Sequence, residues 1–261
     1  MLAAGLRTLL VQPAVGWGAV DVHGAGVYAV FYGGAAHYVG EAIVVSSRIA
    51  QHRRLGSAFL VGLASAGGPD ASRLRIRALP VDLGRLELEE FAIACLRPSG
   101  NRMRLASRAA LAFDDADPDL WARVQVDAPR LLREGVRVAS DVPSVPWREM
   151  QPPSGPGLYI VRDRNGRPVY VGESDALAER LKTHGGSRSY FSALRRHVGT
   201  EILGLSFAPD VRRGFSLADE AAISAYLASC SIAIQPLNVG VWELERELAH
   251  QLGPQLNREH A

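Results

Sequence analysis

Apolar and polar positions alternate on both sides of an Asn-Gly dipeptide, a pattern that predicts a β-hairpin in the second half of the chain. Asn165-Gly166 can supply the two positive-φ positions of a two-residue turn. Such a turn places Tyr159 opposite Gly172, and Tyr170, two residues along its strand, shares the same face. The pattern therefore predicts two phenols on one surface of the hairpin.

The spacing of apolar residues changes to that of a helix directly after the hairpin. Leu177 and Leu181 are four residues apart and are predicted to point inward. Arg180 and His184 then lie one turn apart on a common face. Two phenols, a guanidinium and an imidazole are thereby expected to converge.

The same pattern occurs earlier in the chain. Tyr28, Tyr38, Arg48 and His52 follow one another as Tyr159, Tyr170, Arg180 and His184 do, and Gly40 to Arg48 spans eight residues, as does Gly172 to Arg180. Each copy is preceded by a Pro-x-Val-x-Trp segment, at 13–17 and 143–147, which is predicted to be a lead-in strand. The repeat indicates an internal duplication.

The first hairpin is one residue shorter than the second, so a two-residue loop would put its tyrosines on opposite faces. A three-residue loop through Gly33, Gly34 and Ala35, with a glycine at positive φ, restores the common face. We therefore predict that loop.

The two halves align again without a gap, residues 75–101 against 231–257. Each segment is predicted to form a strand, a turn and a helix that a proline ends. Glu89 and Asn101 are separated by twelve residues, as are Glu245 and Asn257. The second half also has helical patterns over 190–198 and 218–228, a layer that the first half is expected to lack.

The predicted organisation is a first domain over 1–104, a helical spacer over 105–140 and a second domain over 141–261. Within the spacer we expect a helix over 118–126 capped by Asp117, and a second short helix over 129–134. The fold class is α/β (α+β), with two small sheet-and-helix domains related by duplication.

Composition narrows the function classes. The 261 residues are 48% apolar with a net charge of +2, and no apolar run reaches the roughly 18 residues that cross a bilayer. No signal peptide is predicted. Cys95 and Cys230 lack the paired spacing of a disulfide or a zinc site, which favours small core residues in a reducing cytoplasm and leaves oxygen ligands for any metal ion. Basic clusters flank the repeated pattern, and such clusters are typical of a solvated face or of a nucleic-acid contact. They comprise residues 52–54, Lys182, Arg188, Arg195, Arg196, Arg212 and Arg213.

These residues resemble the GIY-YIG nucleases, twice in one chain: Gly26-Val27-Tyr28, Tyr38-Val39-Gly40, Arg48, His52, Glu89 and Asn101, then Gly157-Leu158-Tyr159, Tyr170-Val171-Gly172, Arg180, His184, Glu245 and Asn257. The resemblance implies a three-stranded antiparallel sheet flanked by helices. It also implies hydrolysis of phosphodiester bonds with one divalent metal ion, Mg²⁺ (or Mn²⁺). The first copy departs more from the family pattern, at 44–47 and at Ser99-Gly100, which bears on its activity rather than its fold.

Phosphodiester hydrolysis requires these residue types. Arg48 and Arg180 each offer a planar fork for phosphate, and Glu89 and Glu245 would each hold the metal ion through one carboxylate. A phenol is a weak base at neutral pH, so one tyrosine of each pair must have a lowered pKa or be helped by its histidine. Asn101 and Asn257 are expected to fix the end of the helix that presents the glutamate.

We therefore predict a cytoplasmic DNA endonuclease with two active sites in a pseudo-dimeric monomer, acting on double-stranded DNA in restriction or defence. A dimer of the chain is the alternative assembly. The alternative functions are a repair or structure-selective nickase with one working site, and a nucleic-acid-binding protein without catalysis.

Overall fold

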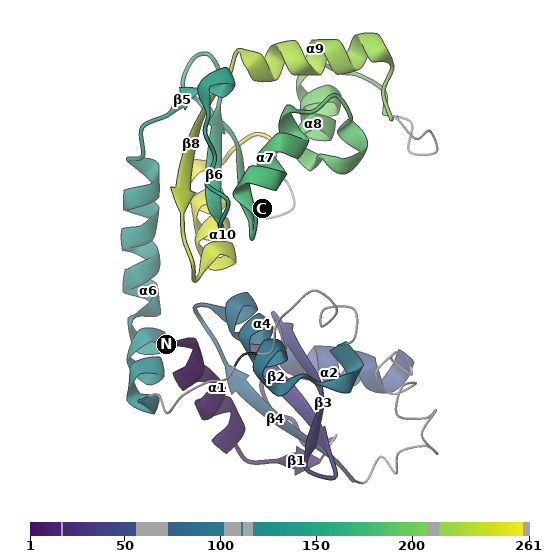
Figure 1. Ribbon diagram of the computed structural model, residues 1–261, viewed down its shortest axis with the longest axis vertical. Helices are drawn as coiled ribbons and strands as arrows, with labels where there is room; N and C mark the ends of the chain where they lie inside the picture. Colours follow the sequence, from purple (N-terminus) through teal and green to yellow (C-terminus); the bar gives the residue numbers. More distant parts are fainter. Residues whose placement is uncertain (17, 56–72, 102–110, 112–116, 208–213, 258–261) are drawn as a thin grey trace. The chain divides into compact units, whose positions relative to one another are not determined.

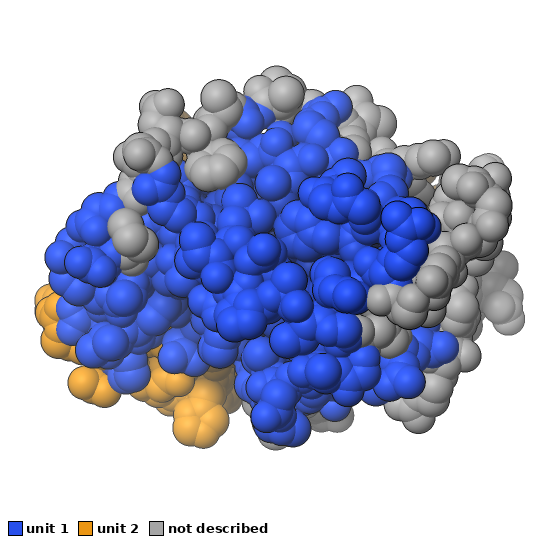
Figure 2. Space-filling model, turned by 90° about the horizontal axis from the view of Figure 1, so that it is seen from below, with its two compact units in different colours: residues 1–129 blue, residues 130–261 orange. Residues whose placement is uncertain are grey.

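The computed structural model describes residues 1–16, 18–55, 73–101, 111, 117–207 and 214–257 (Figure 1). The chain divides into two compact units, Met1–Pro129 and Arg130–Ala261, which Figure 2 colours separately. We call them unit 1 and unit 2. The boundary falls inside a helix of the predicted spacer, so the described part of the spacer is divided between the two units.

Unit 1 contains a four-stranded antiparallel sheet in the order β1-β4-β2-β3. Its elements are α1 (Leu2–Val11), β1 (Val15–Gly16), β2 (Gly26–Tyr32), β3 (Ala35–Ala42), α2 (Val45–Leu55), β4 (Leu74–Pro80), α4 (Arg85–Leu96) and the 3₁₀ turn η2 (Ser99–Asn101).

Unit 2 repeats this order, with a sheet β5-β8-β6-β7. After α6 (Pro118–Ser140) come β5 (Val145–Pro146), the 3₁₀ turn η3 (Trp147–Glu149), β6 (Gly157–Arg162), β7 (Pro168–Ser174), α7 (Leu177–Gly185), the 3₁₀ turn η4 (Ser189–Phe191), α8 (Ala193–His197), the π-helical η5 (Val198–Ile202), α9 (Leu217–Ala228), β8 (Ser231–Pro236) and α10 (Val241–Leu252). The helix predicted over 218–228 is present as α9. The helix predicted over 190–198 is divided, because Ser192 is extended between η4 and α8. Residues 56–72, the corresponding stretch of unit 1, lie outside the described residues.

The predicted mixed α/β fold with two sheet-and-helix halves is confirmed, but the predicted number of strands is wrong. Each sheet has four strands, because the lead-in segment joins its edge. Val15 pairs with Ile76 in unit 1, and Val145 pairs with Ile232 in unit 2. Each lead-in strand is only two residues long and covers the outer edge of β4 or β8.

The predicted register of both hairpins is correct, although neither loop is the predicted one. Tyr28 lies opposite Gly40, and Tyr159 lies opposite Gly172. In unit 1 the loop has two residues, Gly33 and Gly34, both at positive φ, and Ala35 already belongs to β3. A bulge between Val30 and Phe31 leaves one residue of β3 unpaired. This extra residue puts Tyr28 and Tyr38 on the same face, as the longer loop would have done.

The hairpin of unit 2 reaches the same register by a different combination. Its turn runs from Asp163 to Arg167, whose backbones are hydrogen-bonded, with Gly166 at positive φ. The loop therefore has three residues rather than the predicted two, and a bulge between Val161 and Arg162 compensates for the extra residue. The hydrophobic faces determine the register, and the loops adjust to it.

Each sheet buries both of its faces. In unit 1, Val27 and Ala29 pack with α1 and α4, while Tyr28 and Val30 pack with α2. In unit 2, Leu158 and Ile160 pack with α6 and α10, while Tyr159 and Val161 pack with α7, α8 and α9. The tyrosine of the central strand therefore faces the helix that follows the hairpin in both units.

From Asp117 onward, where the structure describes the spacer, its sequence forms one helix, α6, where two short helices were predicted. Asp117 caps its start, since the Asp117 Oδ1 accepts a hydrogen bond from the backbone of Asp119 at 2.9 Å. Pro129 lies within the helix. The first part of α6 packs on unit 1 through Trp121, which is 2% exposed and contacts α1 at Gly5.

Within the described residues, no helix is both long and apolar enough to cross a membrane. Cys95 and Cys230 are both free thiols.

Trp121 should contribute most of the energy that holds the start of α6 on unit 1. Trp121→Ala should lower the free energy of unfolding of unit 1 by about 3–5 kcal/mol, because it removes a fully buried indole. Leu120→Ala should have little effect, since Leu120 is exposed. Urea unfolding followed by hydrogen–deuterium exchange of unit 1 peptides measures both changes. Equal effects of the two substitutions would contradict the packing described here.

Candidate active site

A buried hydrogen bond joins the central strand of unit 2 to the helix after the hairpin. Tyr159 Oη and His184 Nε2 are 2.7 Å apart, and both side chains are 1% exposed. Leu177 and Leu181, fully buried on the same helix, hold α7 against the sheet as predicted. The imidazole is therefore held in place by the packing of the helix that bears it.

Unit 1 contains the same pair with the same geometry. Tyr28 Oη and His52 Nε2 are also 2.7 Å apart, and both side chains are buried. The second tyrosines complete the cluster. The ring centroids of Tyr28 and Tyr38 are 6.1 Å apart, as are those of Tyr159 and Tyr170.

The glycine that ends each Tyr-x-Gly segment makes room for these phenols. A Cβ atom on Gly172 would lie 2.5 Å from the Tyr159 oxygen, and one on Gly40 would lie 2.5 Å from the Tyr28 oxygen. Real side chains do not come so close. A glycine at this position is therefore required by the contact between phenol and strand.

A pocket of about 190 Å³ opens beside the phenols of unit 2, lined among others by Tyr170, Glu173, Arg180 and Glu245. Tyr170 is half-buried and Arg180 is exposed, so both are accessible to a ligand. Glu245 comes from the middle of α10 and is 5% exposed. The structure thus brings together the predicted tyrosines, arginine, histidine and glutamate in one concave site.

The predicted site residues of unit 1 lie in the corresponding elements. Arg48 is on α2, four residues before His52, where its Nη1 donates to Gln51 at 2.6 Å. Glu89 is on α4 and is 4% exposed, and its negative charge acts on Tyr28.

Each asparagine after the helix of the glutamate is hydrogen-bonded to the hairpin strand. Asn257 accepts from Val171 N at 2.9 Å and donates to Val171 O at 2.7 Å. Asn101 makes the same two contacts with Val39, at 2.9 and 2.8 Å. Asn257 also donates to Glu245 Oε1 at 3.3 Å. The amide ties the end of the helix to the strand, and in unit 2 it also orients the carboxylate.

Burial raises the pKa of the phenols and lowers that of the imidazoles. The pKa of Tyr159 is raised by burial and then by the neighbouring Tyr170, and the pKa of Tyr170 is raised by burial and then by Glu245. Burial and then Arg180 lower the pKa of His184 to about 3, and burial and then Arg48 lower that of His52 to about 4. The lowered pKa expected for one tyrosine of each pair is therefore absent from unit 2, where burial raises the pKa of both phenols.

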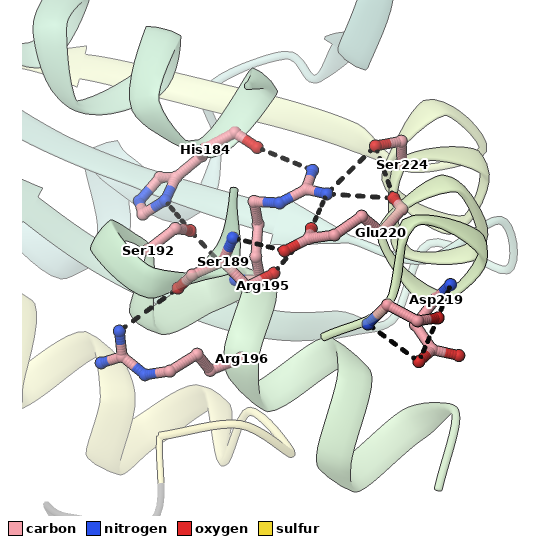
Figure 3. A network of polar contacts seen from close by, with 9 residues as sticks. His184, Ser189, Ser192, Arg195, Arg196, Asp219, Glu220 and Ser224 are labelled. Atoms are coloured by element: carbon pink, nitrogen blue, oxygen red, sulfur yellow. Dashed lines mark hydrogen bonds and ion pairs between the residues drawn. The ribbon is translucent and has the colours of Figure 1, made fainter. Parts of the chain in front are cut away.

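A buried polar network contacts His184 at Nδ1, the ring nitrogen that does not bond Tyr159 (Figure 3). Ser192 Oγ lies 2.6 Å from His184 Nδ1 and accepts from the backbone of Arg195. Arg195 is fully buried and pairs with Glu220 at 2.6 Å, and Glu220 in turn accepts from both the backbone and the hydroxyl of Ser189. The network connects α7, η4, α8 and α9, so it fixes the position of the imidazole.

Sequence reasoning missed part of this site. Arg195 belongs to the basic clusters predicted to form a solvated face or a nucleic-acid contact, but it is fully buried and paired with Glu220, which is also buried. Glu173 was not singled out, although it follows Gly172 as Glu41 follows Gly40, so the repeat itself contained the signal. Arg212 and Arg213 lie outside the described residues.

The donor atoms of unit 2 fit a hard divalent cation. The described residues contain no cluster of three or more histidine, cysteine or acidic side chains suited to a metal ion. Glu173 and Glu245 nevertheless line one pocket, and burial followed by the charge of Glu173 raises the pKa of Glu245 to about 7. Mg²⁺ is commonly held by one or two carboxylates, with water and substrate phosphate completing its coordination. Two carboxylates that repel one another in a small pocket match that requirement.

Compared with protein-family models, with curated proteins and with solved structures, the chain gives no match in any of the three. Its function must therefore be inferred from the geometry of the two sites.

The depressed pKa of His184 makes the stability of unit 2 depend on pH. Below pH 6.5 the unfolded chain binds a proton at this histidine, whereas the folded protein stays neutral there until about pH 3. Stability should therefore fall by about 2 kcal/mol between pH 7 and pH 5 from this group alone. In His184→Gln, which cannot titrate, that part of the slope should vanish. Hydrogen–deuterium exchange of unit 2 peptides in urea at the two pH values provides the test, and an unchanged slope in the variant would refute it.

Proposed function

We propose that the chain is a metal-dependent nuclease that hydrolyses phosphodiester bonds, with DNA as its substrate and with its best-formed active site in unit 2. The observation that supports this proposal is the pocket in which two phenols, Arg180, His184 and the buried Glu245 meet. The same residue types stand in the same order in the GIY-YIG nucleases, which the sequence resembles.

Each side chain has a task that suits its position. Arg180 is exposed at the rim, where its guanidinium can bind a non-bridging phosphate oxygen and stabilise the charge that grows there. Tyr170 is half-buried with its phenol at the pocket, so it can position or deprotonate the attacking water. Tyr159 and His184 form a neutral pair behind it that can exchange a proton.

Glu245 and Glu173 are the residues that would hold Mg²⁺ or Mn²⁺ in unit 2. When bound, the cation supplies a positive charge that neutralises the phosphate and lowers the pKa of nearby groups. Asn257 keeps Glu245 oriented toward the pocket. Burial raises the pKa of both phenols, and a bound cation would lower it.

A second candidate function, nucleic-acid binding without catalysis, is favoured for unit 1 by an arginine row. Arg73, Arg75 and Arg77 line a hollow of about 650 Å³, and the alternation along β4 gives Arg75 and Arg77 the same face. The corresponding residues of unit 2 are Ser229, Ser231 and Ala233. Three guanidiniums in one hollow suit a phosphate backbone.

Cleavage of supercoiled plasmid with Mg²⁺ tests the proposal. Glu245→Gln should lower the rate roughly a thousandfold, about 4 kcal/mol, because it removes the carboxylate that the reaction needs. Glu247→Gln is the matched control, since it removes the same charge from the same helix at a residue that bonds Gln251 instead. Its rate should stay within about twofold of the parent.

No cleavage by the parent protein with Mg²⁺ or Mn²⁺, together with retained DNA binding, would leave the binding function and refute the nuclease. Equal rates for the parent and Glu245→Gln would refute the assignment of the site.

A further inference from the structure

The two glutamate helices begin with different residues at an otherwise matched position. Both α4 and α10 start after a glycine in the left-handed region, Gly84 at φ 84° and Gly240 at φ 75°. The next residue is Arg85 in unit 1 and Val241 in unit 2. In both helices the candidate metal-binding glutamate follows four residues later.

Arg85 is buried inside unit 1, where arginine is rarely found unless it is paired. Its side chain is 3% exposed and forms an ion pair with Glu41. Glu41 follows Gly40, the glycine that the phenol of Tyr28 packs against. The guanidinium is thus fixed beside the site by burial and by a carboxylate partner.

The counterpart of Glu41 in unit 2 has different surroundings. Glu173 lines the pocket together with Glu245, and its charge acts on that residue. Val241, which replaces the arginine, is 5% exposed and has no charge. Unit 2 therefore presents two carboxylates to the pocket, where the exposed Arg180 acts on Glu173, whereas unit 1 pairs Glu41 with a buried guanidinium.

Arg85 lies one helical turn before Glu89 on α4. Residues four apart on a helix share a face, with Cβ atoms about 5–6 Å apart. A guanidinium does not lose its proton in a protein, and solvent screens a buried charge little. The buried Arg85 therefore repels a divalent cation more strongly than the exposed Arg180 at the pocket of unit 2 does. The donor set of unit 1 accordingly does not fit a metal ion, although its phenols and histidine match those of unit 2.

We propose that Arg85 takes the place of the divalent cation in unit 1, so that the chain binds one catalytic metal ion, at Glu173 and Glu245 of unit 2. This inference rests on the proposed nuclease function and assigns the two halves different tasks. Unit 2 cuts one strand, and unit 1 contacts nucleic acid without cutting. The chain then nicks duplex DNA instead of making a double-strand break.

Titration of the full chain with Mn²⁺, with the free ion followed by electron paramagnetic resonance, counts the sites directly. The parent protein should bind one Mn²⁺. Glu245→Gln should weaken this binding more than about tenfold, and Glu89→Gln should leave it unchanged. Both substitutions replace a carboxylate with an amide of the same shape, which disturbs the packing least, and circular dichroism verifies the folding of each variant.

Exchange of the distinguishing residue provides an independent test. Val241→Arg should introduce the fixed charge into unit 2 and weaken Mn²⁺ binding more than about tenfold, while Val241→Met, a long uncharged side chain, should not. Arg85→Val should allow a second Mn²⁺ to bind, and Arg85→Val combined with Glu89→Gln should abolish that second site.

The outcomes separate the inference from the proposed function. Two Mn²⁺ ions in the parent protein, one of them lost in Glu89→Gln, would overturn the inference and leave the nuclease proposal standing. One ion that is lost in Glu89→Gln but not in Glu245→Gln would also overturn it. Absence of any Mn²⁺ binding would overturn both. One ion lost only in Glu245→Gln, with nicked plasmid as the product, supports the assignment.

Discussion

A buried hydrogen bond between a phenol and an imidazole is the interaction on which each half of this chain depends. Tyr159 and His184, like Tyr28 and His52, join the central strand to the helix after the hairpin at 2.7 Å. The bond can form only if the tyrosine faces that helix and a glycine lies opposite it. Strand register, glycine position and helix packing are therefore all linked to one contact.

The hairpins show how strongly this contact constrains the fold. Their loops differ in length, and the strands of each hairpin contain a bulge. Both hairpins nevertheless place the tyrosine opposite the glycine. A slip of one residue would turn every side chain of the strand to the other face. The burial of Tyr28 and Tyr159, both 1% exposed, makes such a slip costly, so the loops differ while the register stays the same.

The repeat made much of the fold and of the candidate site predictable from the sequence. Matched spacings placed the tyrosines, Arg180, His184 and Glu245 on elements that the structure brings together. The lead-in strands were predicted at 13–17 and 143–147, but not that each joins its sheet as a fourth strand, because a two-residue strand has too short a pattern to show its pairing partner. The burial of Arg85 and Arg195 could not be predicted for another reason. Their partners, Glu41 and Glu220, are 44 and 25 residues away in the sequence. Charged residues are exposed by default, and only three-dimensional pairing reverses that expectation.

The proposed hydrolysis and the proposed division of tasks between the units both require a divalent cation at the carboxylates of unit 2, beside the phenols and Arg180. Diffraction from crystals of the full chain grown with Mn²⁺, with data collected near the manganese absorption edge, locates that ion directly. We predict one anomalous peak per chain, about 2.1 Å from a carboxylate oxygen of Glu245. A map with its peak at Glu89, or with no peak at Glu245, would contradict the account.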